Sequence, residues 1–563
     1  MKAGPVVGAR LLGAGVLIYI LCFLIYQSPK IFDYYRVSDD TRQQIYPLYA
    51  ARDSGLFKDD LLTRYFRSHT PPFYYFAHYP LAWLVDPVIL SKISQFALFG
   101  LVLVFLYRIG CLLHGPFLGW TLVFLTVHSP TLAGLTDGGL PRGWAVPGLV
   151  VFSWAVLAGH PRVALAATVV SGLFYPPILL VLGPSYGLWT LAQRSWSLWD
   201  VVGFGLLVVG LWPMVFRSDE IGQIVTVAQA AQMPEWQLGS RFPFLPMPSL
   251  LSLLPRNFVV SYLPPALFGP WAWLLVALGF SAFVIPASSG REAGTTGEWR
   301  AYWEMRRAGL KLPASTVAAA LGLPLVFSLV MFEVSVLLAF RLHIPDRNLK
   351  YTIPILGVIL ITLAVFRLVS WSLARARLST WQGWPALGVI LWVFLIGGSG
   401  FTGNLNLWAD QRFAWKLYAF VEHLPKDALL AGPPAEMDNI PLFSRRKVFV
   451  SDEANQPLYD RYYREVRRRL LRTFDAYYAR DLKVVEDFRN ETGVDYMLVR
   501  KEDFTHRFNR SRYYSEPYNA HILALKKGHS AGEFIFAKPP KQAVVYDDGY
   551  FQVVDLKKLT ADN

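Results

Sequence analysis

Charged residues and cysteines are scarce in this chain of 563 residues. Asp, Glu, Lys and Arg make up 17% of it and hydrophobic residues 54%, whereas about a quarter of the residues of a soluble protein are charged. The two cysteines, Cys22 and Cys111, both lie in apolar stretches. Two such isolated thiols exclude a disulfide framework and a thiolate metal site. The low charge excludes an ordinary soluble protein, so the composition is that of a membrane protein.

Other expected features are missing as well. No Gly-x-Gly-x-x-Gly follows a predicted strand, so the sequence predicts no nucleotide site. No internal repeat is visible, and no Ala-x-Ala cleavage signal follows the first apolar run, which we therefore interpret as a retained span. The formal net charge is +14. Because the basic residues flank apolar segments, we expect them to meet lipid head groups or a phosphate-bearing lipid, and we expect no nucleic-acid partner.

Long apolar segments dominate the first 400 positions. A helix needs about 20 apolar residues to cross a bilayer, and by this measure the sequence predicts about eleven transmembrane helices. The pair around Tyr175-Pro176-Pro177 is open, since its prolines allow either two short helices or one kinked helix. The predicted spans are 11–28, 88–107, 115–133, 144–159, 163–176, 177–193, 199–216, 267–286, 314–340, 351–372 and 384–402.

The charges around these segments predict an orientation. Lys2 and Arg10 precede the first span, which favours a cytoplasmic N-terminus. An odd number of spans then places everything after about residue 403 outside. It also places a basic loop, 287–313, inside. The outer loops are 29–87, 134–143, 217–266 and 341–350.

Polar sequence replaces apolar sequence near Asp410. Short apolar runs at 428–431, 447–451 and 494–499 predict strands, and 457–478 predicts a helix with a basic face. An Asp-Gly turn between 543–546 and 550–554 predicts a β-hairpin. We therefore divide the chain into a membrane bundle, residues 1–403 with the long first outer loop 29–87, and a soluble extracytoplasmic α/β domain, residues 404–563.

The first outer loop opens with two adjacent acids, Asp39 and Asp40. Two neighbouring carboxylates at the mouth of a membrane bundle are costly unless water, a cation or a substrate meets them. A local role is the alternative, because either residue can cap the helix that we predict over Thr41–Asp53, with Arg42 as an ion-pair partner. The local sequence leaves both interpretations open.

The order of these parts resembles the GT-C superfamily of membrane glycosyltransferases, which includes oligosaccharyltransferase catalytic subunits and protein mannosyltransferases. A first span, a long outer loop opening with acids, a bundle of many spans and an outer α/β domain follow one another in both. Short phrases add to the resemblance: Ser38-Asp39-Asp40, Leu56-Phe57-Lys58-Asp59-Asp60, Thr136 to Arg142, His343 to Arg347, and Leu424 to Ala428.

The resemblance implies an integral-membrane enzyme that moves a sugar from a polyprenyl-phosphate-linked donor to an acceptor at the extracytoplasmic face. It implies the inner (plasma) membrane of a bacterium, with the N-terminus cytoplasmic. The sugar and the acceptor are not identified. In this family an acid of the first outer loop lies beside the acceptor and accepts its proton. Asp40 is the first choice for this base and Asp39 the second.

A lipid phosphate that leaves during transfer needs cationic neighbours. Arg347, Arg142 and Arg241 fall in the predicted outer loops or at span ends, so we interpret them as substrate-binding residues together with Asp137. The alternatives are arginines that reach toward lipid head groups and a simple turn role for Asp137. A divalent cation held by Asp39 and Asp40 is left open, because the sequence identifies no third ligand.

Glu333 lies inside a predicted span and is either a functional residue or an ion-pair partner of Arg341. Two other functions stay open for the whole chain. One is a transporter or polymer-handling protein for lipid-linked sugars, which should show two related halves. The other is a non-catalytic GT-C relative that acts through its soluble domain.

Overall fold

The computed structural model describes residues 4–215, 221–243, 247, 249–259, 270–284, 312–338, 341–342, 344–376, 383–396 and 407–559. The predicted inner loop 287–313 lies almost wholly outside these residues, and His343 does too. The same holds for the ends of the predicted spans at 199–216, 267–286, 314–340 and 384–402.

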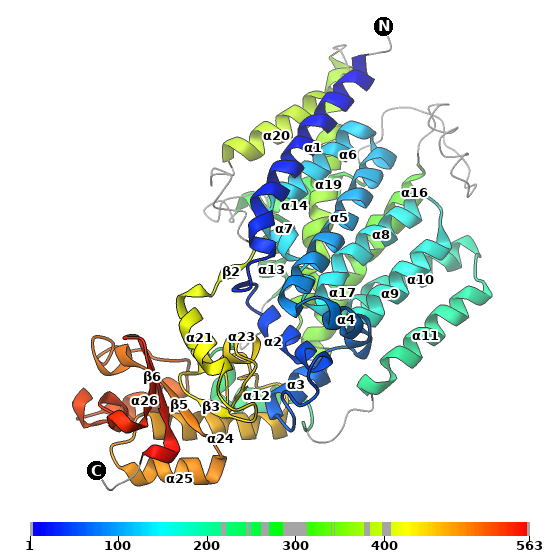
Figure 1. Cartoon of the computed structure of the whole chain (residues 1–563). Helices are drawn as coiled ribbons and strands as arrows, with labels where there is room; N and C mark the ends of the chain where they lie inside the picture. The colour runs from blue at the N-terminus through cyan, green and yellow to red at the C-terminus, as the bar shows by residue number, and fades with distance from the viewer. Residues whose placement is uncertain are drawn as a thin grey trace.

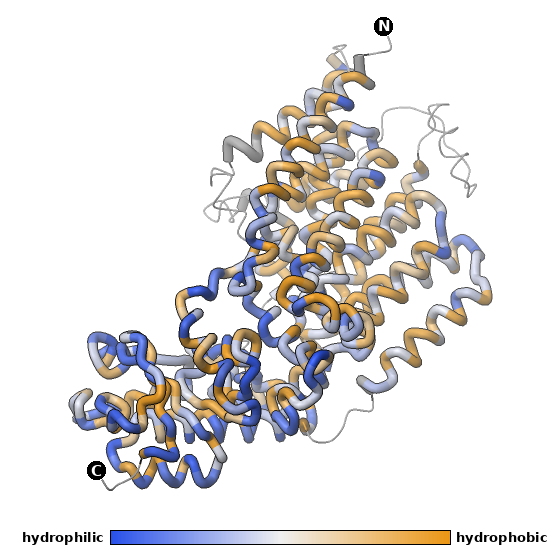
Figure 2. Tube along the Cα trace, viewed as in Figure 1, coloured by the Kyte–Doolittle hydropathy of each residue, from blue (hydrophilic) through white to orange (hydrophobic). Residues whose placement is uncertain are grey.

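Apolar helices form one part of the molecule (Figures 1 and 2). Each predicted span coincides with a helix within the described residues. Proline separates α9 from α10, which resolves the ambiguity at residues 163–193 in favour of two helices, because Pro176 occupies the first turn of α10. The helices are α1 Gly4–Ile31, α5 Pro87–Leu113, α6 Pro116–His128, α8 Ala145–Leu157, α9 Pro161–Phe174, α10 Pro176–Gln193, α11 Leu198–Val215, α14 Pro270–Ser281, α16 Ala314–Val317 continuing into α17 Leu323–Leu338, α19 Ile353–Arg375 and α20 Gly383–Ile396.

Four stretches of these helices are long and apolar enough to cross a membrane, counted over the described residues: Val7–Ile31, Pro87–Leu113, Ala314–Leu338 and Ile353–Leu373. Four further apolar helices are shorter: Pro116–His128, Pro161–Phe174, Leu198–Pro213 and Ala272–Ser281. Large apolar side chains on α1 and α11 are exposed, as expected of surfaces that face lipid. The chain is thus an integral membrane protein, and the number of eleven spans stays a prediction.

The segment 29–87, called the first outer loop after its predicted orientation, is folded rather than extended. It contains β1 (Arg36–Val37), α2 (Thr41–Ile45), α3 (Leu61–His69) and α4 (Pro72–Leu84). The helix predicted over Thr41–Asp53 begins where expected, but it becomes a 3₁₀ helix at Tyr46–Ala51. Pro47 explains the change, because proline has no N–H to continue the α-helical ladder.

A five-stranded mixed sheet forms the core of the C-terminal segment, in the order β4-β3-β5-β7-β6. The two pairs that involve β3 are parallel, and the β5–β7 and β6–β7 pairs are antiparallel. These strands coincide with the apolar runs of the sequence. The strands are β3 Leu429–Ala431, β4 Lys447–Val448, β5 Tyr496–Arg500, β6 Val544–Asp547 and β7 Phe551–Asp555, and the longer helices are α21 Trp415–Glu422, α24 Asp460–Tyr477, α25 Leu482–Thr492 and α26 Tyr518–Lys526.

Shorter helices connect these parts. They are α7 Pro130–Gly134, α12 Val227–Gln232, α13 Leu250–Val259, α18 Arg347–Lys350, α22 Pro434–Met437 and α23 Ile440–Phe443. Two of them, α18 and α23, contribute to the contacts around the first outer loop that are described below.

The first outer loop and the C-terminal segment share one hydrophobic cluster. Tyr65 of α3 stacks on Tyr462 of α24 with ring centroids 3.7 Å apart. β1 also pairs with β2 (Ala409–Asp410) in an antiparallel arrangement, and Arg36 lies 2.7 Å from the carboxylate of Asp410. The loop therefore lies between the bundle and the C-terminal sheet (Figure 1).

Candidate active site

The acid pair lies in the turn between β1 and α2. Asp40 precedes the first residue of α2, yet its side chain makes no capping hydrogen bond. The Asp40 carboxylate instead pairs with Arg142, and that of Asp39 pairs with Arg42. Helix capping therefore does not account for the Asp40 side chain, whereas the Asp39–Arg42 pair is the local contact that the sequence left open.

Asp137 stabilises this turn through hydrogen bonds. It is buried, and its carboxylate accepts hydrogen bonds from the Ser38 hydroxyl, from the Thr41 hydroxyl at 2.8 Å and from the backbone N–H of Gly139 at 3.0 Å. Burial raises the pKa of Asp137, and these hydrogen bonds oppose the rise. Asp137 thus contacts the residues on either side of the acid pair, while its predicted role in substrate binding stays a prediction.

Cationic side chains approach the acid pair from the bundle. Arg142 lies in the 3₁₀ turn Pro141–Trp144, and Arg347 and Lys350 lie on α18. Burial alone would raise the pKa of Asp40, but the attraction of Arg142, Arg347 and Lys350 outweighs burial and holds that pKa below its usual value. Arg142 thus contacts Asp40 and Arg347 lies near enough to influence it, while their role in substrate binding stays a prediction.

Polar atoms beside these arginines lack hydrogen-bond partners among the described residues. Arg347 donates through Nη1 to the Tyr351 hydroxyl at 2.9 Å, but its buried Nε has no hydrogen-bond acceptor. The Asp346 carboxylate lies 3.9 Å from that Nε, too far for a hydrogen bond. The buried hydroxyl of Tyr175 is also unpaired. Buried polar groups are normally satisfied, so a ligand with acceptor oxygens fits this place.

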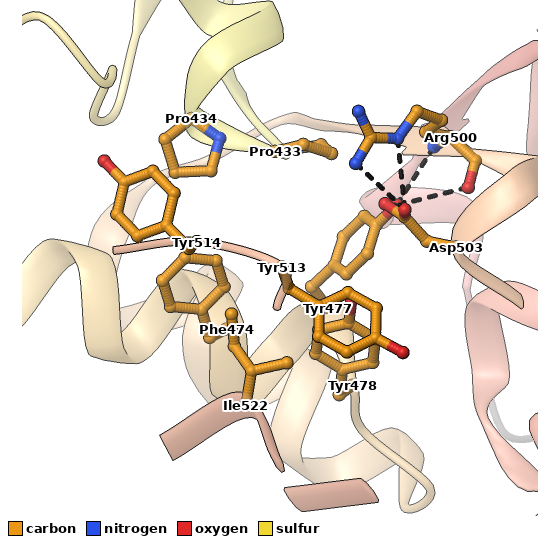
Figure 3. A pocket seen from close by; sticks show the side chains of 11 residues that line it. Pro433, Pro434, Phe474, Tyr477, Tyr478, Arg500, Asp503, Tyr513, Tyr514 and Ile522 are labelled. Atoms are coloured by element: carbon orange, nitrogen blue, oxygen red, sulfur yellow. Dashed lines mark hydrogen bonds and ion pairs between the residues drawn. The ribbon is translucent and has the colours of Figure 1, made fainter. Parts of the chain in front are cut away.

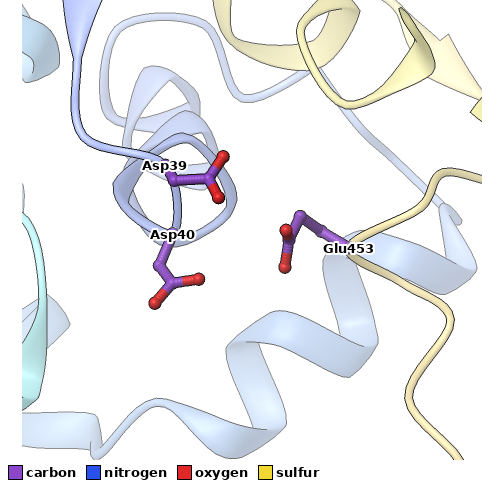
Figure 4. Close-up of side chains that lie close together, drawn as sticks. All are labelled: Asp39, Asp40 and Glu453. Atoms are coloured by element: carbon purple, nitrogen blue, oxygen red, sulfur yellow. The ribbon is translucent and has the colours of Figure 1, made fainter. Parts of the chain in front are cut away.

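A third acid reaches the pair from the C-terminal segment. Carboxylate oxygens of Asp39, Asp40 and Glu453 lie within 4.8 Å of one another, and Figure 4 shows the three side chains close together. Sequence reasoning missed Glu453, because no local motif marks it and only the tertiary fold brings residue 453 to the first outer loop.

Arg241 serves the acids of the C-terminal segment. Its Nη2 lies 2.7 Å from the carboxylate of Glu453, and its Nη1 lies 3.4 Å from that of Asp452. Burial and the neighbouring carboxylates of Asp40, Asp39 and Asp452 raise the pKa of Glu453, although Arg241 opposes the rise. The predicted Arg241 is thus near the acid pair, but it is held by the acids opposite.

The carboxylates of the described residues form two groups with the spacing of metal ligands, Asp39, Asp40 and Glu453 in one and Asp438, Asp452 and Glu453 in the other. In the first group each carboxylate has a guanidinium partner: Arg42, Arg142 and Arg241 respectively. These cations neutralise part of the charge that would attract a metal. A divalent cation held by Asp39 and Asp40 stays a prediction.

An aromatic cavity lies in the C-terminal segment (Figure 3), and one of its lining residues, Tyr514, contacts Asp452. The Tyr514 hydroxyl donates to Asp452, and the Asp452 N–H donates to the carbonyl of Pro434 at 3.0 Å. No residue predicted from the sequence as part of the site lines this cavity. The lining consists of Gly432, Pro433, Pro434, Phe474, Tyr477, Tyr478, Arg500, Asp503, Tyr513, Tyr514 and Ile522.

Among the described residues, Glu333 makes no contact with the acid pair. It lies on α17 with an exposed side chain. The same is true of Arg256 on α13, whose side chain is exposed. Arg256 is therefore useful as a surface control for the arginines of the site.

No family model and no curated protein sequence matches this chain. Comparison with solved structures finds the oligosaccharyltransferase of Archaeoglobus fulgidus in its apo form, with a TM-score of 0.48 and 12% identity over 94% of this chain and 72% of that one. The same archaeal enzyme, AglB, in complex with an inhibitory peptide and a dolichol-phosphate gives a TM-score of 0.45 and 12% identity over 87% of this chain and 70% of that one.

A bacterial structure is found as well. ArnT from Cupriavidus metallidurans, bound to undecaprenyl phosphate, gives a TM-score of 0.41 and 14% identity over the full length of both chains. At these levels the likeness is one of general architecture, and the function below is argued from the site alone. The structural comparison nevertheless returns membrane proteins of the GT-C class that the sequence resembles.

Proposed function

We propose that this protein is an integral-membrane glycosyltransferase that moves a sugar from a polyprenyl-phosphate-linked donor to an acceptor. The observation that carries the proposal is the meeting of opposite charges at the end of an apolar bundle. Asp39 and Asp40 lie on one side, and Arg142, Arg347 and Lys350 on the other. A polyprenyl chain suits the apolar helices, and its phosphate suits the cations.

The two halves of the site match the two halves of a glycosyl transfer. The acceptor oxygen forms a bond with the anomeric carbon while the bond from that carbon to the phosphate oxygen breaks. The electron pair of the broken bond stays on the lipid phosphate, whose growing charge Arg142 and Arg347 stabilise. The acceptor proton passes to a carboxylate on the acid side.

Each predicted residue takes a role in this scheme. Asp40 and Asp39 contact the acceptor, Arg142 and Arg347 bind the phosphate, Asp137 positions the acid pair, and Arg241 holds Glu453. Buried Nε of Arg347 and the unpaired Tyr175 hydroxyl supply further donors for phosphate oxygens. We place the acid pair and residues 404–563 on the extracytoplasmic side of a bacterial inner membrane.

Binding of the lipid phosphate tests one half of the proposal. Undecaprenyl phosphate, the probe, should raise the unfolding temperature of the purified wild-type protein in detergent. Arg142→Gln and Arg347→Gln should lose that stabilisation, whereas the exposed Arg256→Gln should keep it. Equal stabilisation of all four proteins would remove the arginines from the phosphate site.

A release assay tests sugar transfer, the other half of the proposal. It measures undecaprenyl phosphate released from a panel of undecaprenyl-phosphate sugars in membranes that supply the acceptor. Asp40→Asn should lower release by about 10²–10⁴-fold, because the acid side loses a charged contact to the acceptor. The wild-type protein could instead release undecaprenyl phosphate no faster than Asp40→Asn with every sugar while still binding the lipid. That result would favour a non-catalytic relative.

A further inference from the structure

The acid side of the site is built from two distant parts of the chain. Asp39 and Asp40 come from the turn before α2, and Glu453 comes from the C-terminal segment between β4 and α24. Their carboxylate oxygens lie within 4.8 Å of one another (Figure 4). An acceptor hydroxyl that enters the space between these oxygens would therefore meet carboxylates from both parts.

The two sides of this space differ in what holds their carboxylates. Asp40 is paired with Arg142, and Arg347 and Lys350 also attract its negative charge. The proposed function assigns Arg142 and Arg347 to the leaving phosphate. Glu453 is held by a different cation, Arg241, through one of its two oxygens. A proton on Asp40 would therefore lie beside cations that are needed for the phosphate, whereas the cation beside Glu453 has no part in phosphate binding.

We propose that Glu453 is the catalytic carboxylate that accepts the proton of the acceptor, while Asp40 and Asp39 orient the acceptor by accepting hydrogen bonds. This inference rests on the proposed glycosyl transfer and assigns its proton. The acceptor O–H bond breaks as the oxygen bonds to the anomeric carbon, and the proton moves to the free oxygen of Glu453. The sugar–phosphate bond breaks with its electron pair on the lipid phosphate, and Glu453 later returns the proton to water.

The electrostatics of the surroundings support this division of roles. A general base works best when its pKa lies near the working pH. Burial and the carboxylates of Asp40, Asp39 and Asp452 raise the pKa of Glu453, and Arg241 opposes them. Asp438, whose carboxylate accepts the Glu453 N–H at 2.8 Å, adds a further acid to these surroundings. The pKa of Asp40, in contrast, is held low by its arginines.

Comparison of two neighbouring variants gives the test. Glu453→Gln should lower kcat of the release reaction by about 10²–10⁴-fold and abolish its acid-side pH dependence, because the amide accepts no proton. Asp452→Asn, from the same turn, is the comparison variant. It should keep the maximal rate but move the acid limb of the pH–rate profile to lower pH by about one unit, since one negative neighbour of Glu453 is removed.

Arg241→Gln should move the acid limb the opposite way, to higher pH, because the cation that favours ionised Glu453 is gone. Stabilisation by undecaprenyl phosphate should be unchanged in Glu453→Gln, which separates loss of the base from loss of the fold. A purely structural role for Glu453 predicts none of these opposed shifts.

The outcomes distinguish this inference from the proposed function. Near wild-type kcat in Glu453→Gln, together with a deep loss in Asp40→Asn, would overturn the assignment of the proton and leave the transferase intact. An acid limb that stays in place in both Asp452→Asn and Arg241→Gln would overturn it as well. Absence of release by the wild-type protein with every donor would remove the proposed function itself.

Discussion

Asp137 fixes the turn that carries the acid pair. One carboxylate satisfies two hydroxyls, of Ser38 and Thr41, and the N–H of Gly139. Leaving buried donors unpaired costs about 1–3 kcal/mol each. The precision of the site thus depends on a residue that itself need not meet the substrate.

Two substitutions of Asp137 should separate positioning from charge. Asp137→Leu should lower the unfolding temperature and reduce kcat by about tenfold or more, since the turn loses its acceptor. Asp137→Asn should retain most of both, because its amide oxygen still accepts and the hydroxyls can reorient. Thermal unfolding and the release assay measure the two effects. Equal losses in both variants would mean that the charge of Asp137, rather than its geometry, matters.

Lys92 is the second residue whose removal should be costly. It is fully buried on α5, and its Nζ donates to the carbonyls of Lys30 at 2.9 Å and Asp33 at 2.5 Å, at the end of α1. Lys92→Met should destabilise the protein by about 1–3 kcal/mol, because these carbonyls lose their donor. Thermal unfolding in detergent measures this. Lys483→Met, at an exposed position of α25, is the control and should unfold like wild type.

Residue patterns pointed to acids and arginines of the candidate site but missed Glu453. Asp39 and Asp40 stand out because two adjacent carboxylates at the end of an apolar bundle are costly unless water, a cation or a substrate meets them. Arg142 and Arg347 stand out because they border predicted spans. Glu453 has no such local signal, and its place depends on the packing of the C-terminal segment against the first outer loop.

At the scale of elements, α2 is too short to hold its own position. Its Arg42 donates through Nη1 to the side-chain oxygen of Asn439 at 2.5 Å, just before α23. The Asn439 amide nitrogen donates in turn to the hydroxyl of Tyr418 at 2.9 Å and to the side chain of Gln411 at 3.2 Å. The orientation of the acid pair therefore depends on a polar contact with the C-terminal segment.

Asn439→Leu should break this contact without a large change in volume. We expect a loss of about 1–3 kcal/mol in unfolding free energy, because Arg42 and Tyr418 lose a buried partner. We also expect kcat to fall more than the binding of undecaprenyl phosphate, since the acids move and the arginines of the bundle do not. The exposed Asn490→Leu is the control. Unchanged kcat in Asn439→Leu would show that α2 is held by its apolar contacts alone.

Element positions were predictable where composition decides them. Apolar runs gave the helices of the bundle, and Asp547-Asp548-Gly549 gave the hairpin of β6 and β7. The change from α-helix to 3₁₀ helix at Tyr46 follows from Pro47 and could have been anticipated. The pairing of β1 with β2 could not, because each strand has two residues and the paired Arg36 and Asp410 lie 374 positions apart in the sequence.

At the scale of the whole molecule, the first outer loop and the C-terminal segment share a core. The cluster contains Tyr46, Tyr65 and Tyr74 from the loop together with Leu430 and Tyr462 from the C-terminal segment. A shared core makes two segments open together rather than separately. The division at residue 403, which the sequence suggested, is therefore a boundary in composition whose structural independence needs a test.

Leu430→Asp provides that test. A carboxylate at this buried position of β3 should unfold the C-terminal sheet. If the core is shared, trypsin should then also cleave the first outer loop at Arg64 and Arg67, which can be mapped by mass spectrometry. Val484→Asp, at an exposed position of α25, should leave the wild-type cleavage pattern. Digestion of the C-terminal segment with the loop still protected would show two independent units.

A ribosome makes residues 37–90 long before residues 414–559, yet the aromatic face of the former has its permanent neighbours in the latter. During synthesis this face must stay unassembled, or be covered by something else, until the last strand emerges. A chain that stops before residue 414 would therefore expose this aromatic face, because its apolar neighbours would be missing.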